Sequence, residues 1–165
     1  MNEVLEAIRA RRSIRRFSPG AVTEDELRMI LDAGRWTPSG KNTQPWRFVV
    51  VKSAEKREAL ARLAPQDRMI ETAPVTIGVL YDRDAGYDLL KDAHGIGAAI
   101  ENILLAVHSL GLAACWMGKA RVPEIEALLE AKSTEELAAL IPIGHPGEEP
   151  APPPRRELSE IVRYI

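Results

Sequence analysis

Residues 89–110 constrain the fold more than any other stretch, because they form the longest helical pattern in the chain. Its apolar positions occupy more than one side of the helix, and they are Ile96, Ala99, Ile100, Ile103, Leu104 and Val107. A helix that is apolar on most sides must be covered by other elements. Gly95 and Gly97 each cost about 1 kcal/mol in a helix interior, which indicates a close neighbour such as a second helix. The sequence therefore predicts a long, largely buried helix.

Four apolar segments are predicted to be strands, and they are residues 47–51, 74–81, 112–117 and 137–143. In the last segment Pro142 has no N–H to donate to a ladder, so we expect that end to lie at a sheet edge or a strand terminus. Shorter helices are predicted between the strands, over residues 24–33, 54–63 and 124–130, with one more after Asn2 that ends near Arg11. The helix at 24–33 follows a capping box formed by Thr23 and Glu26.

Length and charge limit the class of protein. The chain has 165 residues, of which 45% are hydrophobic, enough for one domain with one core. A net charge of -2 argues against nucleic acid or an anionic membrane as the main partner. The single cysteine, Cys115, excludes an internal disulfide, and no stretch is apolar and long enough to span a bilayer. We expect a cytoplasmic protein.

Residues 11–17 concentrate positive charge in this nearly neutral chain. They hold four arginines and Ser13 between two predicted helices. Arginine binds phosphate through planar, bidentate, charge-assisted hydrogen bonds, so the cluster suits one bound phosphate. The alternative interpretation is a solvated basic face at a helix end. The polar, turn-forming residues 36–46 precede a strand, and loops in such positions often carry sites.

The C-terminal segment differs in character from the rest. Residues 148–154 are rich in proline and predict a stiff, extended arm, and an apolar face follows at Leu158, Ile161, Val162 and Ile165. Because five extended residues reach roughly 16 Å, this face can dock on a partner chain. We therefore divide the chain into a domain over residues 1–147 and an arm over residues 148–165.

Several motifs occur together in a fixed order. They are Arg11-Arg12-Ser13-Ile14-Arg15, Pro38-Ser39 with Asn42, Gln44, Pro45 and Trp46, the segment 92–106, residues 110–112, Cys115-Trp116-Met117-Gly118, residues 141–146 and Arg155. In this order the chain resembles the FMN-dependent nitroreductase family along most of its length. The resemblance implies an α+β fold in which helices wrap a central, mostly antiparallel sheet. It also implies an intertwined homodimer with exchange of the C-terminal arms, and two flavin sites between the subunits.

The resemblance supplies roles by motif position. It implies that FMN phosphate and ribityl groups are held by Arg11, Arg12, Ser13 and Arg15, with Arg155 closing on the phosphate. It places Pro38, Ser39 and Asn42 on the opposite side of the cofactor, and it includes Gln44 among the cofactor-binding residues. Met117 and Gly118 would offer backbone N–H groups near the reactive flavin nitrogen. No side chain is expected to be catalytic, since the flavin carries the chemistry.

The function implied is an NAD(P)H oxidoreductase that reduces nitroaromatics, quinones or related small acceptors by ping-pong hydride transfer. Dehalogenation, flavin conversion, and a flavin-binding or regulatory module without turnover stay open as alternatives. The choice between NADH and NADPH is also open. Four features depart from typical relatives: the short segment 82–92, which leaves less chain to roof the flavin, Glu101 where Gln is common, His145 where Tyr is usual, and Pro153 where some relatives have a second basic residue. Because of Pro153, the choice between Arg155 and Arg156 as the phosphate contact of the arm is open. The three histidines and Cys115 show no metal-ligand spacing, so no metal is expected.

Overall fold

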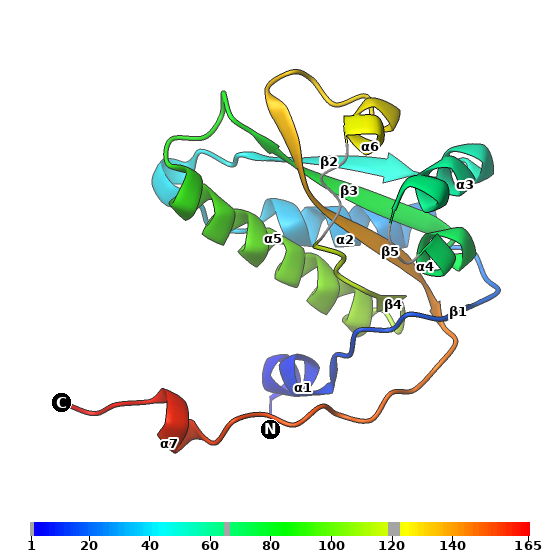
Figure 1. Cartoon of the computed structure of the whole chain (residues 1–165). Coiled ribbons are helices and arrows are strands. Elements are labelled where there is room, and N and C mark those ends of the chain that lie inside the picture. Colours follow the sequence, from blue (N-terminus) through cyan, green and yellow to red (C-terminus); the bar gives the residue numbers. More distant parts are fainter. Residues whose placement is uncertain (1, 65–66, 119–122) are drawn as a thin grey trace.

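A computed structural model describes residues 2–64, 67–118 and 123–165 of the chain (Figure 1). Its elements in chain order are α1 (Glu3–Ala10), β1 (Phe17–Ser18), α2 (Glu24–Arg35), the 3-10 helix η1 (Gly40–Asn42), β2 (Trp46–Val51), α3 (Ala54–Leu63), α4 (Asp67–Thr72), β3 (Val75–Asp82), α5 (Leu89–Ser109), β4 (Ala113–Ala114), α6 (Pro123–Leu128), β5 (Glu135–Pro146) and α7 (Leu158–Ile161).

The strands form one five-stranded sheet in the order β1-β5-β3-β2, with β4 also paired to β5. All four strand pairings are antiparallel. The longest of them joins β3 to β5, from Val75 opposite Ile143 to Asp82 opposite Glu135. These observations confirm the α+β class and the mostly antiparallel sheet.

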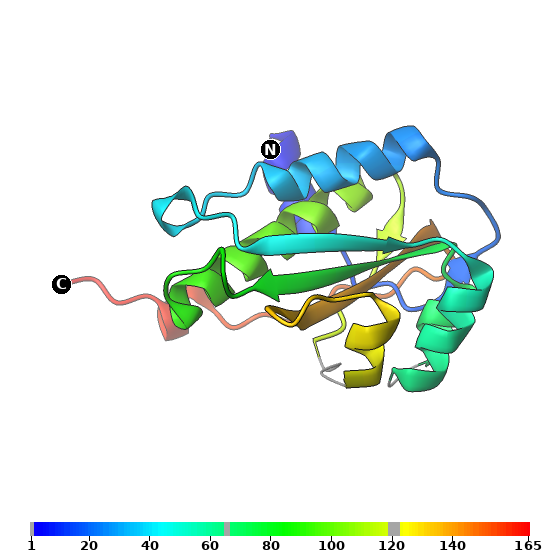
Figure 2. The same ribbon diagram turned by 90° about the horizontal axis from the view of Figure 1, so that it is seen from above.

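Helices cover both faces of the sheet (Figure 2). On one face α2 and α5 pack on the sheet through a cluster that includes Ile30, Ile100 and Ile141. On the other face α3, α4 and α6 bury a second cluster, represented by Leu60 and Leu140. Seven residues of α5 are buried, including the predicted apolar set, so the long buried helix is confirmed.

Local signals explain where several helices begin. Thr23 and Glu26 form the reciprocal capping box ahead of α2, and Asn2 accepts the Leu5 N–H at the start of α1. Asp88 caps α5 by accepting the Lys91 N–H at 3.0 Å. Each cap satisfies a donor that the helix itself leaves unpaired. These signals are local in sequence, which is why they could be read in advance.

Two strand predictions were wrong in extent. The strand expected over 112–117 is only Ala113–Ala114, with one isolated bridge from Met117 to Leu140. The strand expected over 137–143 is the twelve-residue β5, and Pro142 lies inside it opposite Thr76. The Pro142 carbonyl accepts the Cys115 N–H on the β4 side. Because N–H and C=O of one residue point to the same side of a strand, the missing donor faces the short β4 ladder, where little pairing is lost.

The residues after 150 stand apart from this packed body. Every residue from 151 to 165 is exposed, and in Figure 1 the segment extends away from the sheet toward the free C-terminus. Its apolar side chains Leu158, Ile161 and Tyr164 are 73%, 62% and 93% exposed. The described chain therefore consists of a packed body and an extended arm that the body does not cover.

Candidate functional site

The arginine cluster, defined as Arg11, Arg12, Ser13, Arg15 and Arg16, lies on an extended segment that runs beside β4. Ser13 forms an isolated parallel bridge with Ala114, and the Ile14 N–H donates to the Ala114 carbonyl at 3.0 Å. Ile14 between them is buried, while Arg15 and Arg16 are exposed. The sheet edge thus fixes the backbone, and the buried isoleucine forces its charged neighbours outward.

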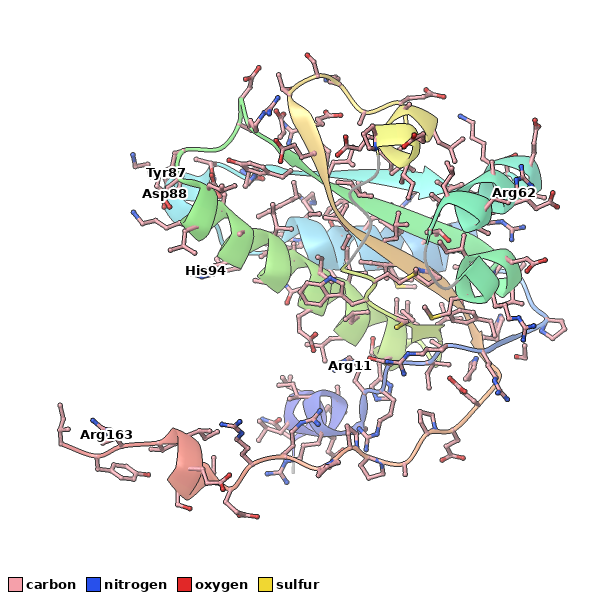
Figure 3. All side chains as sticks on the ribbon, in the orientation of Figure 1. Arg11, Arg62, Tyr87, Asp88, His94 and Arg163 are labelled. Atoms are coloured by element: carbon pink, nitrogen blue, oxygen red, sulfur yellow. The ribbon has the colours of Figure 1, made fainter. Side chains whose placement is uncertain are left out.

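Arg11 is held from a distant part of the chain. Its Nε donates to Oε1 of Glu101 on α5 at 3.1 Å, and the Arg11 side chain is 21% exposed. Within the part of the chain that the structure describes, the hydrogen bond of this side chain uses Nε and leaves the two terminal nitrogens without one. Figure 3 shows Arg11 between α1 and the C-terminal half of α5. This guanidinium keeps its two-pronged donor edge available.

The side chain of Arg12 is bonded to the end of α1. Its Nη1 donates to the carbonyls of Arg9, Ala10 and Arg11 at 2.6, 3.0 and 2.9 Å. Side chains of this type bind the last unpaired carbonyls at a helix C-terminus. Arg12 therefore closes the end of α1, and the phosphate contact that we expected from it stays a prediction for its remaining donors.

A carboxylate also lies within the cluster. Glu148, at the root of the arm, accepts the Arg15 N–H at 2.6 Å, and its other oxygen is 3.8 Å from Nε of Arg16. Next to it, Gly147 donates to the Arg16 carbonyl at 2.9 Å. These contacts tie the start of the arm to the cluster. Arg155 lies further along, exposed, and its Nη1 bonds only the nearby carbonyls of Pro153 and Pro154 in the described residues.

A cavity of about 490 Å³ adjoins the cluster. Its lining includes Arg11 and Arg12 on one side, the C-terminal part of α5 and residues 111–114 on another, and the arm residues Glu148, Pro150 and Pro152. A hollow with two guanidiniums in its wall suits an anionic group attached to a larger organic molecule. The donor set therefore fits the phosphate end of FMN.

The second group of predicted site residues is the 38–44 loop. Lys41, Asn42 and Gln44 all have positive φ, at 54°, 57° and 49°. Non-glycine residues rarely adopt this conformation, and such strain often gathers at ligand sites. Ser39 supports the loop because its Oγ accepts the Gln44 N–H at 3.0 Å. Pro38 and Asn42 are exposed, so the loop presents its predicted contacts outward.

Tyr87 of the short segment 82–92 holds this loop in place. A Cβ added at Gly40 would lie 1.9 Å from the Tyr87 hydroxyl, so the ring packs directly on the loop backbone. The ammonium groups of Lys41 and Lys91 lie 4.8 and 5.5 Å from the ring centroid. Buried Asp92 fixes the approach to α5 by accepting the backbone N–H groups of Tyr87 and Asp88. Segment 82–92 thus acts as a support for the loop.

The two groups lie at opposite ends of α5. The loop meets α5 near Gly95, where Pro38 and Ser39 are the neighbours, whereas the cavity at the cluster reaches Val107 and His108. Thirteen residues separate Gly95 from His108, which is about 20 Å of helix. In Figure 3, Tyr87 and Asp88 mark the loop end of α5, and Arg11 lies toward the other. A single chain does not bring the two groups together.

The backbone N–H of Met117 is paired inside the packed body, and its expected contact with the flavin stays a prediction. The Met117 N–H donates to the Leu140 carbonyl at 2.9 Å, and the Leu140 N–H returns the bond to Met117 at 3.0 Å. This two-bond bridge uses the donor that we expected to face the flavin. Gly118, which follows, is exposed, and its role stays a prediction.

Cys115 is buried, and its surroundings affect its thiol. Burial raises the pKa of the Cys115 thiol, while the guanidiniums of Arg15 and Arg11 act in the opposite direction. A buried, protonated thiol is a poor nucleophile.

In the described ranges, no three histidine, cysteine or acidic residues gather as a metal site would need. No helix in those ranges has both the length and the apolar character to cross a membrane.

Sequence reasoning missed the supporting roles of three residues, Glu101, Glu148 and Tyr87. Glu101 had been noted only as a departure from relatives, and the ion pair that it forms spans 90 positions. Glu148 reaches its partner across 133 positions. No local pattern signals contacts over such separations. The aromatic residue Tyr87 within a short polar loop was the one visible signal.

The sequence model of the Nitroreductase family matches residues 8–67 and 62–145. A provisionally named NADH dehydrogenase/NAD(P)H nitroreductase of Methanothermobacter thermautotrophicus is 38% identical over 152 residues, covering 90% of this chain and 80% of the relative. An NADPH-flavin oxidoreductase of Vibrio harveyi is 29% identical, covering 98% and 73%. An iodotyrosine deiodinase of Thermotoga neapolitana is 23% identical, covering 99% and 98%.

Solved structures give the same result. A provisionally named nitroreductase of Desulfovibrio desulfuricans, crystallised in complex with FMN, superposes with a TM-score of 0.90 at 38% identity, covering 100% of this chain and 98% of that one. Nitroreductase A of Vibrio parahaemolyticus superposes with a TM-score of 0.92 at 28% identity, covering 99% and 76%. The likeness therefore includes the arm as well as the packed body.

Proposed function

Because the chain belongs to the nitroreductase family, we propose that it uses FMN to pass electrons from NAD(P)H to nitroaromatics, quinones or related small acceptors. It is a flavin-dependent oxidoreductase. The observation that supports the proposal is the cavity beside the arginine cluster, with Arg11 and Arg12 in its wall. The single cysteine is compatible with the reducing cytoplasm, where we propose that the enzyme acts.

The chain's own residues have binding and orienting roles in this reaction. Arg11 and Arg15 would hold the FMN phosphate through charged hydrogen bonds, with Ser13 between them for a ribityl hydroxyl. Pro38, Ser39 and Asn42 would contact the other side of the cofactor. Bound FMN would supply the hydride-accepting centre, so the protein needs no activated nucleophile. One open face used in turn by donor and acceptor gives ping-pong kinetics.

We propose that the working unit is a homodimer. The arginine cluster and the 38–44 loop lie at opposite ends of α5, so a site that uses both needs a second copy of the chain. In a two-fold dimer, a contact of residue i with residue j is repeated as j with i. The two ends of α5 would then each meet the opposite group from the partner. The exposed apolar residues of the arm, such as Leu158 and Ile161, need a covering surface of this kind.

Purified protein tests the cofactor and the reaction. We expect visible flavin absorbance, stoichiometric uptake of FMN by protein stripped of cofactor, and bleaching by NADH or NADPH without oxygen. Acceptor assays with a nitroaromatic and a quinone should then show parallel lines in double-reciprocal plots. A protein that takes up no FMN contradicts the proposal, and FMN uptake without bleaching by either nicotinamide favours a binding module.

Mixed dimers test the shared site. One subunit carries Arg11→Ala with Arg15→Ala, the other Ser39→Ala with Asn42→Ala, and each homodimer should bind FMN poorly. Random reassociation makes half the dimers mixed, each with one intact site, so about a quarter of the wild-type sites should return. No recovery after subunit exchange, with mixed dimers verified by mass spectrometry, would show that each site belongs to one subunit.

Dehalogenation is the second candidate, since an iodotyrosine deiodinase matches over nearly all of both chains. Iodide release from a halogenated tyrosine by the reduced protein, measured against nitroaromatic reduction, discriminates the two reactions. We expect nitroaromatic reduction to be faster by at least about tenfold, a difference of about 1.4 kcal/mol in activation free energy.

A further inference from the structure

We propose that Glu101 is a positioning residue, which aims the guanidinium of Arg11 at the phosphate of FMN. This inference rests on the proposed function, because it assumes that FMN is the ligand of the arginine cluster. It goes further by assigning a task to a residue on α5 that does not line the cavity.

The contact itself is specific in geometry. Nε of Arg11 donates to Oε1 of Glu101 at 3.1 Å. The Arg11 side chain is 21% exposed and that of Glu101 is 41% exposed, so the pair is partly shielded from water. By comparison, Arg16 is 83% exposed and its closest approach to a carboxylate is 3.8 Å. An open pair of the second kind contributes little, whereas a partly buried, hydrogen-bonded pair holds its geometry.

The planarity of the guanidinium converts this bond into an orientation. Its five N–H groups lie in one plane, and a bond at Nε fixes that plane from one edge. The edge formed by the two terminal nitrogens then points elsewhere, and this edge is the one that can bind a phosphate with two parallel bonds. Arg11 lines the cavity of about 490 Å³, but Glu101 does not. The carboxylate thus holds the guanidinium from outside the cavity.

The rest of the cluster does not offer an equivalent orientation. Nη1 of Arg12 is used by three carbonyls at the end of α1. Arg15 is exposed, and among the described residues its Nη1 makes a single 3.4 Å contact, with the Ser13 carbonyl. Among the described hydrogen bonds, Arg11 is the member of the cluster whose guanidinium is held by a carboxylate at Nε rather than through a terminal nitrogen, so its orientation sets where the phosphate binds.

A negative charge next to a phosphate site also has a cost, and this gives the proposal its sharpest test. If Glu101 acts by its hydrogen bond, Gln at this position keeps the acceptor and removes the repulsion. If Glu101 acts only by its charge, removal of that charge should strengthen phosphate binding whether Gln or Ala replaces it. The two roles therefore predict different rank orders of affinity.

The experiment measures the dissociation constants of FMN and riboflavin, by quenching of flavin fluorescence, for wild type, Glu101→Gln and Glu101→Ala stripped of cofactor. We expect Glu101→Ala to weaken FMN binding by about tenfold, because an unheld arginine must be ordered on binding. Riboflavin, which lacks the phosphate, should bind all three proteins alike. Glu101→Gln should bind FMN at least as tightly as wild type.

Two controls separate positioning from a general structural effect. Asp32→Ala removes one negative charge from the Arg35 ion pair on α2, and it should leave both affinities unchanged. In an Arg11→Ala background, Glu101→Ala should cause no further loss, since Glu101 acts through Arg11. This second comparison stays informative even if Glu101→Ala alone lowers the amount of folded protein.

Three results would overturn the inference: tighter or unchanged FMN binding by Glu101→Ala, equal losses for FMN and riboflavin, or Glu101→Gln as weak as Glu101→Ala. Failure of wild type to bind FMN would instead overturn the proposed function, and the inference with it. The two failures are therefore distinguishable.

Discussion

The arginine cluster and the 38–44 loop are the two halves of the candidate site, and they are built differently. In the cluster the backbone is ordinary extended chain and the side chains carry the function, with a partly buried Arg11 and exposed Arg15 and Arg16. In the loop the backbone is the unusual part, because three non-glycine residues have positive φ. We therefore expect the cluster to recognise a ligand by charge and the loop to recognise it by shape. Substitutions in the cluster and in the loop should therefore change the affinities for FMN and for riboflavin in different ways.

The largest difference between the changes in FMN affinity and in riboflavin affinity should come from the double variant Arg11→Ala/Arg15→Ala. Each charged hydrogen bond contributes about 1.5–3 kcal/mol, so FMN affinity should fall by about a hundredfold or more. Riboflavin affinity should hardly change, because it has no phosphate to lose. Titration of both ligands by fluorescence measures the contrast. Equal losses for both would mean that the cluster shapes the whole site.

Ser39→Ala tests the loop, and here we expect FMN and riboflavin to lose affinity equally. It removes the acceptor of the Gln44 N–H, a bond worth about 1 kcal/mol, and releases a strained turn. FMN and riboflavin should both bind about fivefold more weakly, since the loop contacts the part that they share. Ser39→Thr keeps the hydroxyl and should restore both affinities. If only FMN affinity fell, the loop would have to contact the phosphate and not the part that FMN and riboflavin share.

Tyr87→Ala removes the ring that supports the loop from segment 82–92. Because cation–π contacts at exposed sites contribute about 0.5–1 kcal/mol, we expect a loss of about threefold for both ligands. Tyr87→Phe, which keeps the ring, is the matched control and should behave like wild type. Hydrogen exchange of residues 38–44 should accelerate in Tyr87→Ala alone. Unchanged exchange would show that the loop holds its conformation by itself.

Lys41→Gly is expected to stabilise the folded protein slightly, whereas the preceding variants are expected to weaken ligand binding. Glycine adopts the φ of 54° without strain, so the free energy of unfolding should rise by less than about 1 kcal/mol, after the entropy lost by glycine on folding. Thermal unfolding of the cofactor-free protein measures it. A clear drop in melting temperature would mean that the contact of Lys41 with Tyr87 outweighs the strain.

The smallest effect concerns Cys115. Burial raises the pKa of its thiol, and Arg15 and Arg11 counteract part of that rise. Removal of both arginines should raise this pKa further, so less thiolate is present at a given pH and labelling by a thiol reagent slows. In wild type the labelling rate should increase as the pH rises. Faster labelling in the double variant would instead report a looser packing around β4.

Sequence reasoning predicted the elements with local signals. The capping box of Thr23 and Glu26 located the start of α2, and the apolar pattern of residues 89–110 located α5. It failed where pairing partners are far apart: β1 was not predicted, β4 was expected to be longer, and Pro142 was expected at a sheet edge or a strand terminus although β5 continues through it. Register across a sheet depends on both strands, and a single segment does not contain that information.

In the candidate site, too, the sequence indicated the local features, and the tertiary structure was needed for the distant contacts. The composition of residues 11–17 was compatible with either an anion site or a solvated basic face, and the ordered motifs of the family resemblance favoured the anion site. Only the tertiary structure showed that Arg12 closes α1, that Glu101 holds Arg11, and that Met117 gives its N–H to Leu140. Residue type fixes which bonds a side chain is able to make. Which of them it does make depends on neighbours brought close by folding, and those lie up to 133 positions away.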